Sequence, residues 1–522
     1  MPKNLLNTSD KSSFIVNLNM DKYRAVCVRF LLAVLWLTGI AQAINELTMS
    51  SLTDIDTQAN VGGFGAVLAY FLLSVRSVST VFTFIGVLAL IWMLIGIVRL
   101  QFPKSCIPLY CILACSLAWG VVSLCHSFDT NCSLLGYPLR DEGLLSLLLY
   151  AVAFYLGSML RRPENRTRFF NGIIVFGIAQ VFWGFLQAQP FFPFPSSYRN
   201  IEPIMLNELR LPSGFTDSPI TYAMLLAMLI AVSVPASFMA GRKLHRVLAV
   251  VCAAGSIIMS FKTQTIAGVI AGTAGFLLTV ICTILFRKQT AGKKWIMPLT
   301  AFCAVCTSLV WVWFSPAVNG TYQRSNDEKL GNGFCLCDGG IVWDDSYYRI
   351  FTTGPYVPSQ PHDFDINDAA GVMKYCWSEG VRVIGKYPAL GTGPDNFHFT
   401  QLHSSMEILT NPNSIDRPYN DFLYIGATRG IPALIMHLIL LGWCVFLAWR
   451  RRKNAYGWQL TAAAAGAVMY SLTAFVGISV LTVAPLFWML LGIAASETIV
   501  EESPKKKERA PKQKKKTSAS ES

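Results

Sequence analysis

Long apolar stretches separated by short polar segments dominate this chain of 522 residues. Stretches of roughly 18 to 22 apolar residues can cross about 30 Å of hydrocarbon as α-helices, whose backbone hydrogen bonds are satisfied internally. The pattern therefore predicts an all-α fold, a polytopic membrane helical bundle of about twelve transmembrane helices. The predicted spans are 25–44, 79–98, 105–125, 143–160, 169–188, 218–239, 245–261, 266–286, 295–314, 424–449, 459–475 and 478–496.

Lysine and arginine residues gather on one side of this arrangement. They cluster at 161–168, 287–294 and 450–453 and in the carboxyl tail. Because cytoplasmic loops carry an excess of these residues, we predict that both termini are cytoplasmic. The segment 62–75 is apolar but short, and as a further span it would move 161–168 outside. We interpret it as an external amphipathic or re-entrant piece.

Composition excludes an ordinary soluble domain. The chain is 53% apolar and 14% charged, with a mean hydropathy of +0.45, whereas charged residues make up about a quarter of soluble domains. Much of the net charge of +13 lies in the inner loops and in the lysine-rich tail. A tail of this composition is typical of a segment that maintains the membrane topology or contacts anionic membrane lipids. It does not predict a nucleic-acid partner.

The spans and the loops between them predict five regions. One loop, of about a hundred residues, is unusually long, and loops of that length are commonly functional. The regions are a cytoplasmic N-terminus (1–24), nine transmembrane helices (25–314), a large extracytoplasmic loop (315–423), three transmembrane helices (424–496) and a disordered Lys-rich cytoplasmic tail (497–522).

The large loop contains a helix pattern and a glycine turn. Residues 365–368 resemble a helix start, and apolar residues at helical spacing continue to about 385. This helix is predicted to lie on the membrane surface. A tight turn follows at 391–397, and then His398 and His403 on a predicted short helix. A turn of this kind is typical of a simple connector.

The octet at 416–423 reads DRPYNDFL and leads directly into a long apolar helix. Asp416 is a plausible N-cap and Pro418 suits a first turn, which predicts a helix from about 418 to 450. Gly430 followed by Pro432 predicts a kink. At 1.5 Å per residue such a helix exceeds the hydrocarbon thickness, so its first turns stand outside or line a water-filled cavity.

The cysteines indicate no metal site, since no pair has the spacing of a zinc site. Cys335 and Cys337 are external and can form a disulfide, with Cys376 or Cys132 as possible partners. Free thiols are the alternative.

Four segments together resemble the O-antigen ligase and O-antigen polymerase superfamily, in a form like that of Gram-positive bacteria. They are 136–144, 208–222, 385–397 and 416–434. The resemblance implies a twelve-helix glycosyltransferase of the GT-C type in the cell membrane. Such an enzyme takes a glycan from an undecaprenyl-diphosphate-linked oligosaccharide on the outer face. It passes the glycan to a second lipid-linked glycan or to another surface acceptor, and needs no cofactor and no metal.

A lipid diphosphate leaving group calls for arginine, whose guanidinium pairs bidentately with phosphate oxygens and keeps its proton. Arg210 matches the family's loop arginine and is the first diphosphate-binding candidate. Arg140 lies beside Asp141 and Glu142, where an internal salt bridge is the alternative. The further candidates are Arg382, Arg349, Arg417 and Arg429.

The proton acceptor is less defined. In ligases of the family a histidine precedes the asparagine that corresponds to Asn420, and this chain has Tyr419 there. A phenol with a pKa of about 10 is a poor base at neutral pH. The catalytic candidates are His398, Tyr419, Asn420 and Asp421. Other groups near in sequence that can replace the missing base are His403 and Asp416, unless positioning and diphosphate stabilisation suffice.

Two other classes of protein stay open. One is a lipid-linked oligosaccharide flippase or other transporter, and the other is an inactive scaffold of a polysaccharide assembly complex. Transporters usually hold ionisable residues in mid-membrane, whereas the predicted spans have almost none. The sequence does not indicate which sugar or acceptor is used, or distinguish polymerase from ligase.

Overall fold

A computed structural model describes most of the predicted helices and part of the large loop. The described residues are 19–56, 77–99, 102–136, 141–188, 212–263, 265–285, 334–337, 340–343, 369–397, 399–402, 417–454 and 456–499.

Within these residues, eight helices are long and apolar enough to cross a membrane. They confirm the prediction of a polytopic helical membrane protein. The eight are α2 (Met20–Asp56), α4 (Ser77–Val98), α5 (Ile107–Cys125), α8 (Pro163–Gln187), α9 (Pro219–Met239), α10 (Lys243–Lys262), α11 (Ile266–Leu285) and α18 (Asp421–Arg450).

Three further predicted spans form shorter helices. These are α7 (Leu144–Ser158), α19 (Gly457–Thr473) and α20 (Ala484–Ala495). The span predicted at 478–496 is too long, because α20 starts only at Ala484 with Pro485 in its first turn. Residues 474–483 instead connect α19 to α20. The predicted span 295–314 lies outside the described residues.

The remaining elements are short or lie in the large loop. The helix predicted from 365–368 onward is confirmed as α16. A hairpin of two antiparallel strands is the one described departure from the predicted all-α fold. These elements are η1 (Lys104–Cys106), α6 (Thr130–Leu135), β1 (Phe334–Cys337), β2 (Gly340–Trp343), α16 (Ala369–Lys386) and α17 (Phe399–Leu402).

Of the two alternatives for the external cysteines, a disulfide through Cys376 or Cys132 is not formed, since neither residue takes part in a disulfide. Cys335 and Cys337 lie on β1, with Val342 and Gly340 opposite them in the hairpin.

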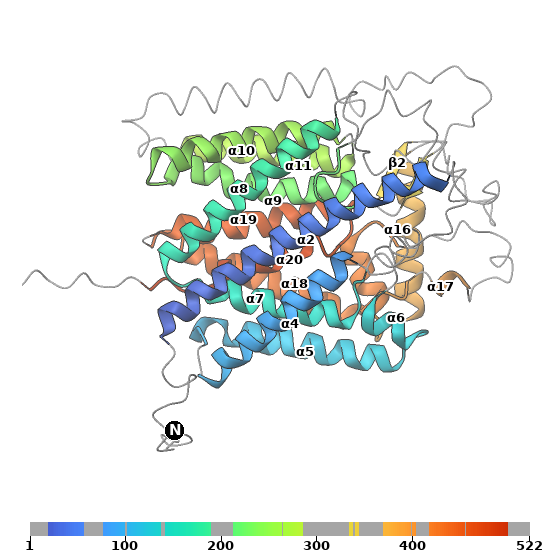
Figure 1. The fold of residues 1–522 in the computed structure, drawn as a ribbon. Coiled ribbons are helices and arrows are strands. Elements are labelled where there is room, and N and C mark those ends of the chain that lie inside the picture. The colour runs from blue at the N-terminus through green and yellow to red at the C-terminus, as the bar shows by residue number, and fades with distance from the viewer. Residues whose placement is uncertain are drawn as a thin grey trace, which may run out of the picture.

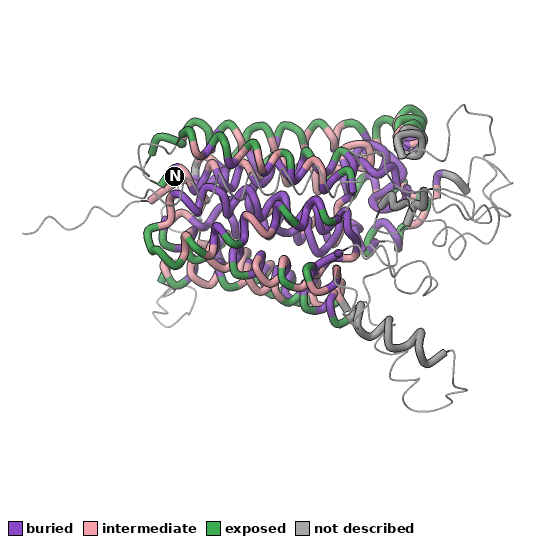
Figure 2. The backbone as a smooth tube through the Cα atoms, turned by 90° about the horizontal axis from the view of Figure 1, so that it is seen from above, coloured by how far each residue is buried: buried purple, intermediate pink, exposed green. Residues whose placement is uncertain are grey.

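Helix α9 is the centre of the bundle. Nearly all of its residues are buried, and it packs against α8, α10, α11 and α19. Elsewhere in the bundle, α20 packs against α7, and α18 packs against α5, α19 and α20. Figure 2 shows buried residues along the interior and exposed ones on the outward edges of the outer helices.

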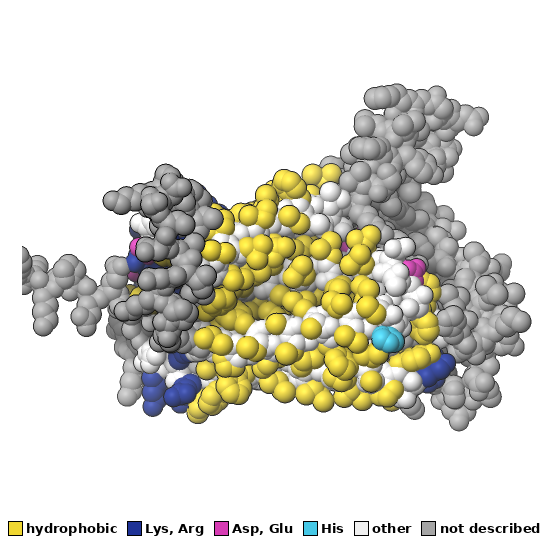
Figure 3. All heavy atoms as spheres, turned by 90° about the horizontal axis from the view of Figure 1, so that it is seen from below, with side chains coloured by type: hydrophobic (Ala, Val, Ile, Leu, Met, Phe, Trp, Pro, Cys, Tyr) yellow, Lys and Arg dark blue, Asp and Glu magenta, His cyan; other side chains and the backbone are white. Residues whose placement is uncertain are grey.

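The long helices run side by side, and α16 lies across one end of them (Figure 1). Apolar side chains cover the middle of the face seen in Figure 3, and lysine and arginine side chains gather near its two ends. Such an apolar band with charged ends is the surface expected of a protein that spans a bilayer.

The end of the bundle opposite α16 is rich in arginine. Arg451 donates hydrogen bonds to the carbonyl groups of Ala495 and Ser496, both at 2.7 Å. Arg161 forms an ion pair with Glu497 at 2.8 Å. These contacts fix the residues that follow α20.

Candidate active site

Helix α18 begins at a side-chain cap. The Asn420 side-chain oxygen accepts hydrogen bonds from the backbone N–H groups of Phe422 and Leu423, both at 3.1 Å. Asn420 is therefore the N-cap, and the predicted start at 418 is wrong. The three residues 417–419 precede the helix in non-helical backbone.

The predicted kink of α18 is confirmed at Gly430, which has φ +82° and ψ +168°. A kink leaves backbone groups without their partners in the helix. Here the glycine turn of the large loop supplies the partners. The hydrogen bonds run from Thr392 N to Ala427 O (3.0 Å), from Gly393 N to Thr428 O (2.9 Å) and from Ile431 N to Pro388 O (2.8 Å).

The glycines make this contact possible. Gly391 and Gly393 have positive φ angles of +68° and +101°. A Cβ atom at Gly391 would clash with the backbone of Thr428. The turn at 388–397 is therefore more than a connector, because it holds α18 in its bent form.

Helix α5 supports the same kink from another side. Trp119 Nε1 donates a hydrogen bond to the carbonyl of Arg429 at 3.1 Å. Ser123 Oγ contacts the carbonyl groups of Leu390, at 2.6 Å, and Thr428, at 3.2 Å. The backbone of Arg429 is thus fixed by elements distant in sequence.

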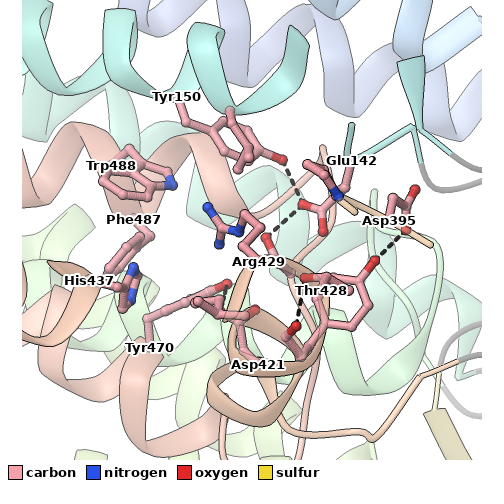
Figure 4. A pocket seen from close by; sticks show the side chains of 15 residues that line it. Glu142, Tyr150, Asp395, Asp421, Thr428, Arg429, His437, Tyr470, Phe487 and Trp488 are labelled. Carbon is pink, nitrogen blue, oxygen red and sulfur yellow. Dashed lines mark hydrogen bonds between the residues drawn. The ribbon is translucent and has the colours of Figure 1, made fainter. Parts of the chain in front are cut away.

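A pocket lies beside the kink. Its lining comes from α7 and the segment before it, the glycine turn, α18, α19, the 474–483 connector and α20. In Figure 4 the Arg429 side chain projects from α18 into the middle of the labelled side chains. The polar lining residues are Glu142, Tyr150, Asp395, Asp421, Tyr424, Thr428, Arg429, His437, Tyr470 and Ser479.

Each of the three carboxyl groups in the pocket is paired with a hydroxyl group. Glu142 Oε1 accepts hydrogen bonds from Tyr150, at 2.7 Å, and from Ser479, at 2.6 Å. The hydroxyl of Tyr424 donates to Asp395 Oδ1.

The third carboxyl group, that of Asp421, has a longer contact, 3.5 Å from the hydroxyl of Tyr470. The backbone N–H of Asp421 also donates to the carbonyl of Ala474 at 2.9 Å. The start of α18 is thus tied to the end of α19.

Glu142 precedes α7 and is buried. Burial raises its pKa from the ordinary value of 4.5 to about 8, and the negative charges of Asp421 and Asp395 act in the same direction. The hydrogen bonds from Ser479 and Tyr150 act in the opposite direction but are outweighed. Glu142 is therefore largely protonated at neutral pH.

One wall of the pocket is aromatic. The ring of Phe487 stacks on Tyr470, with centroids 4.5 Å apart, and on His437, with centroids 5.9 Å apart. The rings of His437 and Trp488 meet edge to face at 5.8 Å. The pocket thus combines flat ring surfaces with carboxyl groups and one guanidinium.

Of the catalytic candidates proposed from the sequence, some line the pocket and others do not. Asp421 lines the pocket, whereas Asn420 caps the helix. Tyr419 is buried in a cluster with Cys376 and Phe397, outside the pocket lining. His398 lies outside the described residues.

The arginine candidates also differ in their position relative to the pocket. Arg417 is buried at the segment before α18. Arg382 is exposed on α16 and pairs with Glu379 at 2.7 Å. The positions of Arg210, Arg140 and Arg349 lie outside the described residues. Among the described arginines, Arg429 lines the pocket.

Sequence reasoning did not assign Glu142, Asp395 or Ser479 to a site. Glu142 and Asp395 lie within two of the four segments that carry the family resemblance. The sequence therefore indicated their segments as functional, but not these two residues. Ser479 was missed because the residues around it were predicted to be part of a span. In the structure these residues form a connector, and Ser479 lines the pocket.

The bundle and its polar pocket define a polytopic helical membrane protein with a candidate site at one end of the bundle. A family model described as O-antigen ligase matches residues 248–438. This match supports the resemblance to the O-antigen ligase superfamily that the sequence motifs predicted. The matched region runs from α10 to the middle of α18 and includes Asp395, Asp421 and Arg429. No curated protein matches the sequence.

Proposed function

We propose that this protein is a membrane glycosyltransferase that joins undecaprenyl-diphosphate-linked glycans on the outer face of the cell membrane. The family match indicates glycosyl transfer in a broad sense. The proposal adds the carrier, the side of the membrane and the residues that act.

The observation that carries the proposal is the convergence of distant segments on one pocket. Three of the four segments that resemble the family, 136–144, 385–397 and 416–434, each contribute a carboxyl group to it. A pocket that gathers ionisable residues from several parts of a membrane protein is a strong candidate for a functional site.

The charges of the pocket suit a sugar better than an isolated diphosphate. Among the described lining residues, three carboxyl groups, those of Glu142, Asp395 and Asp421, face the guanidinium of Arg429. Carboxylates accept hydrogen bonds from hydroxyl groups, and aromatic rings such as Trp488 pack against apolar faces. We assign the pocket to the sugar at the reacting bond.

Arg429 is then placed to stabilise the oxygen that leaves with the diphosphate. Its guanidinium is a fixed cation in a site shielded from water, where charge stabilisation is strong. We assign the binding of the remaining negative charge of the diphosphate to arginines predicted from the sequence. The candidates are Arg210, Arg140 and Arg417.

The reaction is a substitution at the anomeric carbon. The acceptor oxygen forms a bond to that carbon, and the bond from the carbon to the phosphate oxygen breaks. The electron pair of the broken bond leaves with the lipid diphosphate. The proton of the acceptor hydroxyl passes to a carboxylate, and Asp421 is our assignment because its one hydrogen bond in the pocket is long.

The proposed orientation places the α16 end outside the cell. The opposite end carries Arg161, Arg166 and Arg451, as expected of a cytoplasmic side. Helix α16 lies across the outer end, where a surface helix is expected.

The direct test uses purified protein and an undecaprenyl-diphosphate-linked oligosaccharide. A longer lipid-linked product identifies a polymerase, and transfer to a different acceptor identifies a ligase. Movement of the intact donor across vesicles without transfer would identify a transporter and refute the proposal. The variants Arg429→Ala and Arg452→Ala serve as the test and its control, since Arg452 follows the carboxyl end of α18 and lies over the ring of Trp449, away from the pocket lining.

A further inference from the structure

Glu142 has an unusual position for an acidic residue near a substrate that carries negative charge. It is buried, with 8% of its surface exposed, and it lines the pocket. An ionised carboxylate here would add to the charges of Asp395 and Asp421 and would repel a diphosphate.

The hydrogen bonds of Glu142 involve only one of its two oxygens. Two hydroxyl groups, from Tyr150 on α7 and Ser479 in the connector, both donate to Oε1. Within the described part of the chain, both of these hydrogen bonds go to Oε1 and none goes to Oε2. Since the two lone pairs of Oε1 are occupied, a proton on this carboxyl group resides on Oε2.

We propose that Glu142 acts as a neutral positioning residue, whose Oε2–H group donates a hydrogen bond to an oxygen of the bound glycan donor. This inference rests on the proposed function for the identity of the ligand. It assigns Glu142 the opposite role to Asp421: Glu142 donates a hydrogen bond, and Asp421 accepts a proton.

The acidic neighbours of Glu142, Asp421 of α18 and Asp395 of the glycine turn, favour its protonated form, whereas the cation Arg429 of α18 opposes it. The other titratable side chains that line the pocket are Tyr424 and His437 of α18, Tyr150 of α7 and Tyr470 of α19. The raised pKa of about 8 agrees with this arrangement.

The pH dependence follows from the direction of that shift. The folded state favours the protonated form of Glu142. The resulting contribution to the stability of the fold is complete below pH 4.5 and is lost as the pH rises through about 8. Donor binding is therefore expected to weaken above pH 8, when Oε2 loses its proton and the pocket gains a negative charge.

The test compares Glu142→Gln with Glu142→Ala. Glutamine keeps an oxygen that accepts from Tyr150 and Ser479 and places an N–H donor where Oε2 lies. We expect transfer by Glu142→Gln within about threefold of the unmodified protein at pH 7, and a loss of about tenfold or more for Glu142→Ala. The alkaline decline should disappear in Glu142→Gln.

A second measurement does not depend on transfer. Infrared spectra of the purified protein should contain the carbonyl band of a protonated carboxylic acid that disappears on titration through pH 8. Glu142→Gln should lack that band. If the band is absent from the unmodified protein, or if Glu142→Gln is as impaired as Glu142→Ala, the inference is wrong. Failure of transfer by every variant with the band present would instead refute the proposed function.

Discussion

Gly430 of α18 lies directly against the backbone carbonyl of Ala389 in the glycine turn, and a Cβ atom at Gly430 would clash with that oxygen. The positive φ angle of Gly430 adds a second reason for glycine at this position. The contact joins the large loop to the helix that carries Arg429.

Gly430→Ala is expected to straighten or displace α18 and separate it from the turn. The protein should unfold at a lower temperature and lose transfer activity. Gly442→Ala is the matched control on the same helix, because a Cβ atom there meets nothing within 4 Å. Thermal unfolding in detergent, together with a transfer assay, checks both. Equal behaviour of the two variants would contradict the role assigned to the contact.

Arg429→Ala should reduce transfer by about 100-fold or more, the cost typical of removing a group that stabilises developing charge. Arg429→Lys should recover part of the loss, since the charge returns without the bidentate geometry. Arg452→Ala should retain transfer and membrane level. A fully active Arg429→Ala variant would remove Arg429 from the mechanism.

Asn420→Ala should destabilise the protein by about 1 kcal/mol, because the N–H groups of Phe422 and Leu423 lose their cap. Asn420→Ser keeps a capping oxygen and should restore stability. If Asn420→Ser is stable but inactive, the amide has a role in the reaction beyond the cap. Thermal unfolding and transfer rates distinguish the two.

Asp421→Asn tests the proposed proton acceptor. The substitution keeps the size of the side chain and removes its basicity, so the chemical step should slow by about 100-fold or more. Asp395→Asn, whose carboxyl is already bonded to Tyr424, should slow it less. Single-turnover measurements give both rates, and the reverse order would transfer the assignment to Asp395.

Arg210→Ala tests the arginine predicted from the sequence alone. We expect loss of glycan polymerisation or transfer while the protein still reaches the membrane, because the diphosphate loses a bidentate partner. Glycan chain length and membrane level are the measurements. Unchanged chain length would count against a diphosphate role for Arg210.

Much of the fold could be predicted from the sequence, because hydropathy and periodicity report directly on lipid-exposed and buried helices. The helix at Ala369–Lys386 and the kink at Gly430 were predicted from local signals that act within a few residues. The start of α18 was placed at 418 because Asp416 and Pro418 compete with Asn420 as start signals, and only the geometry of the cap distinguishes them.

The pocket could be predicted only in part. Its segments were recognised, but their convergence depends on contacts between residues hundreds of positions apart, such as Glu142 with Ser479. No local pattern encodes such a contact. The same limit applies to the glycine turn, which reads as a connector until its partner at the kink is known.

Three of the hydrogen bonds between the turn and the kink join main-chain atoms, and none of them uses the side chain of Pro394. A mutant library that keeps Gly391, Gly393 and Gly430 can therefore vary Pro394, which lines the pocket, without losing the scaffold. Such a library offers a route to new sugar specificities by directed evolution, because the recognition surface changes while the bend that holds Arg429 is preserved.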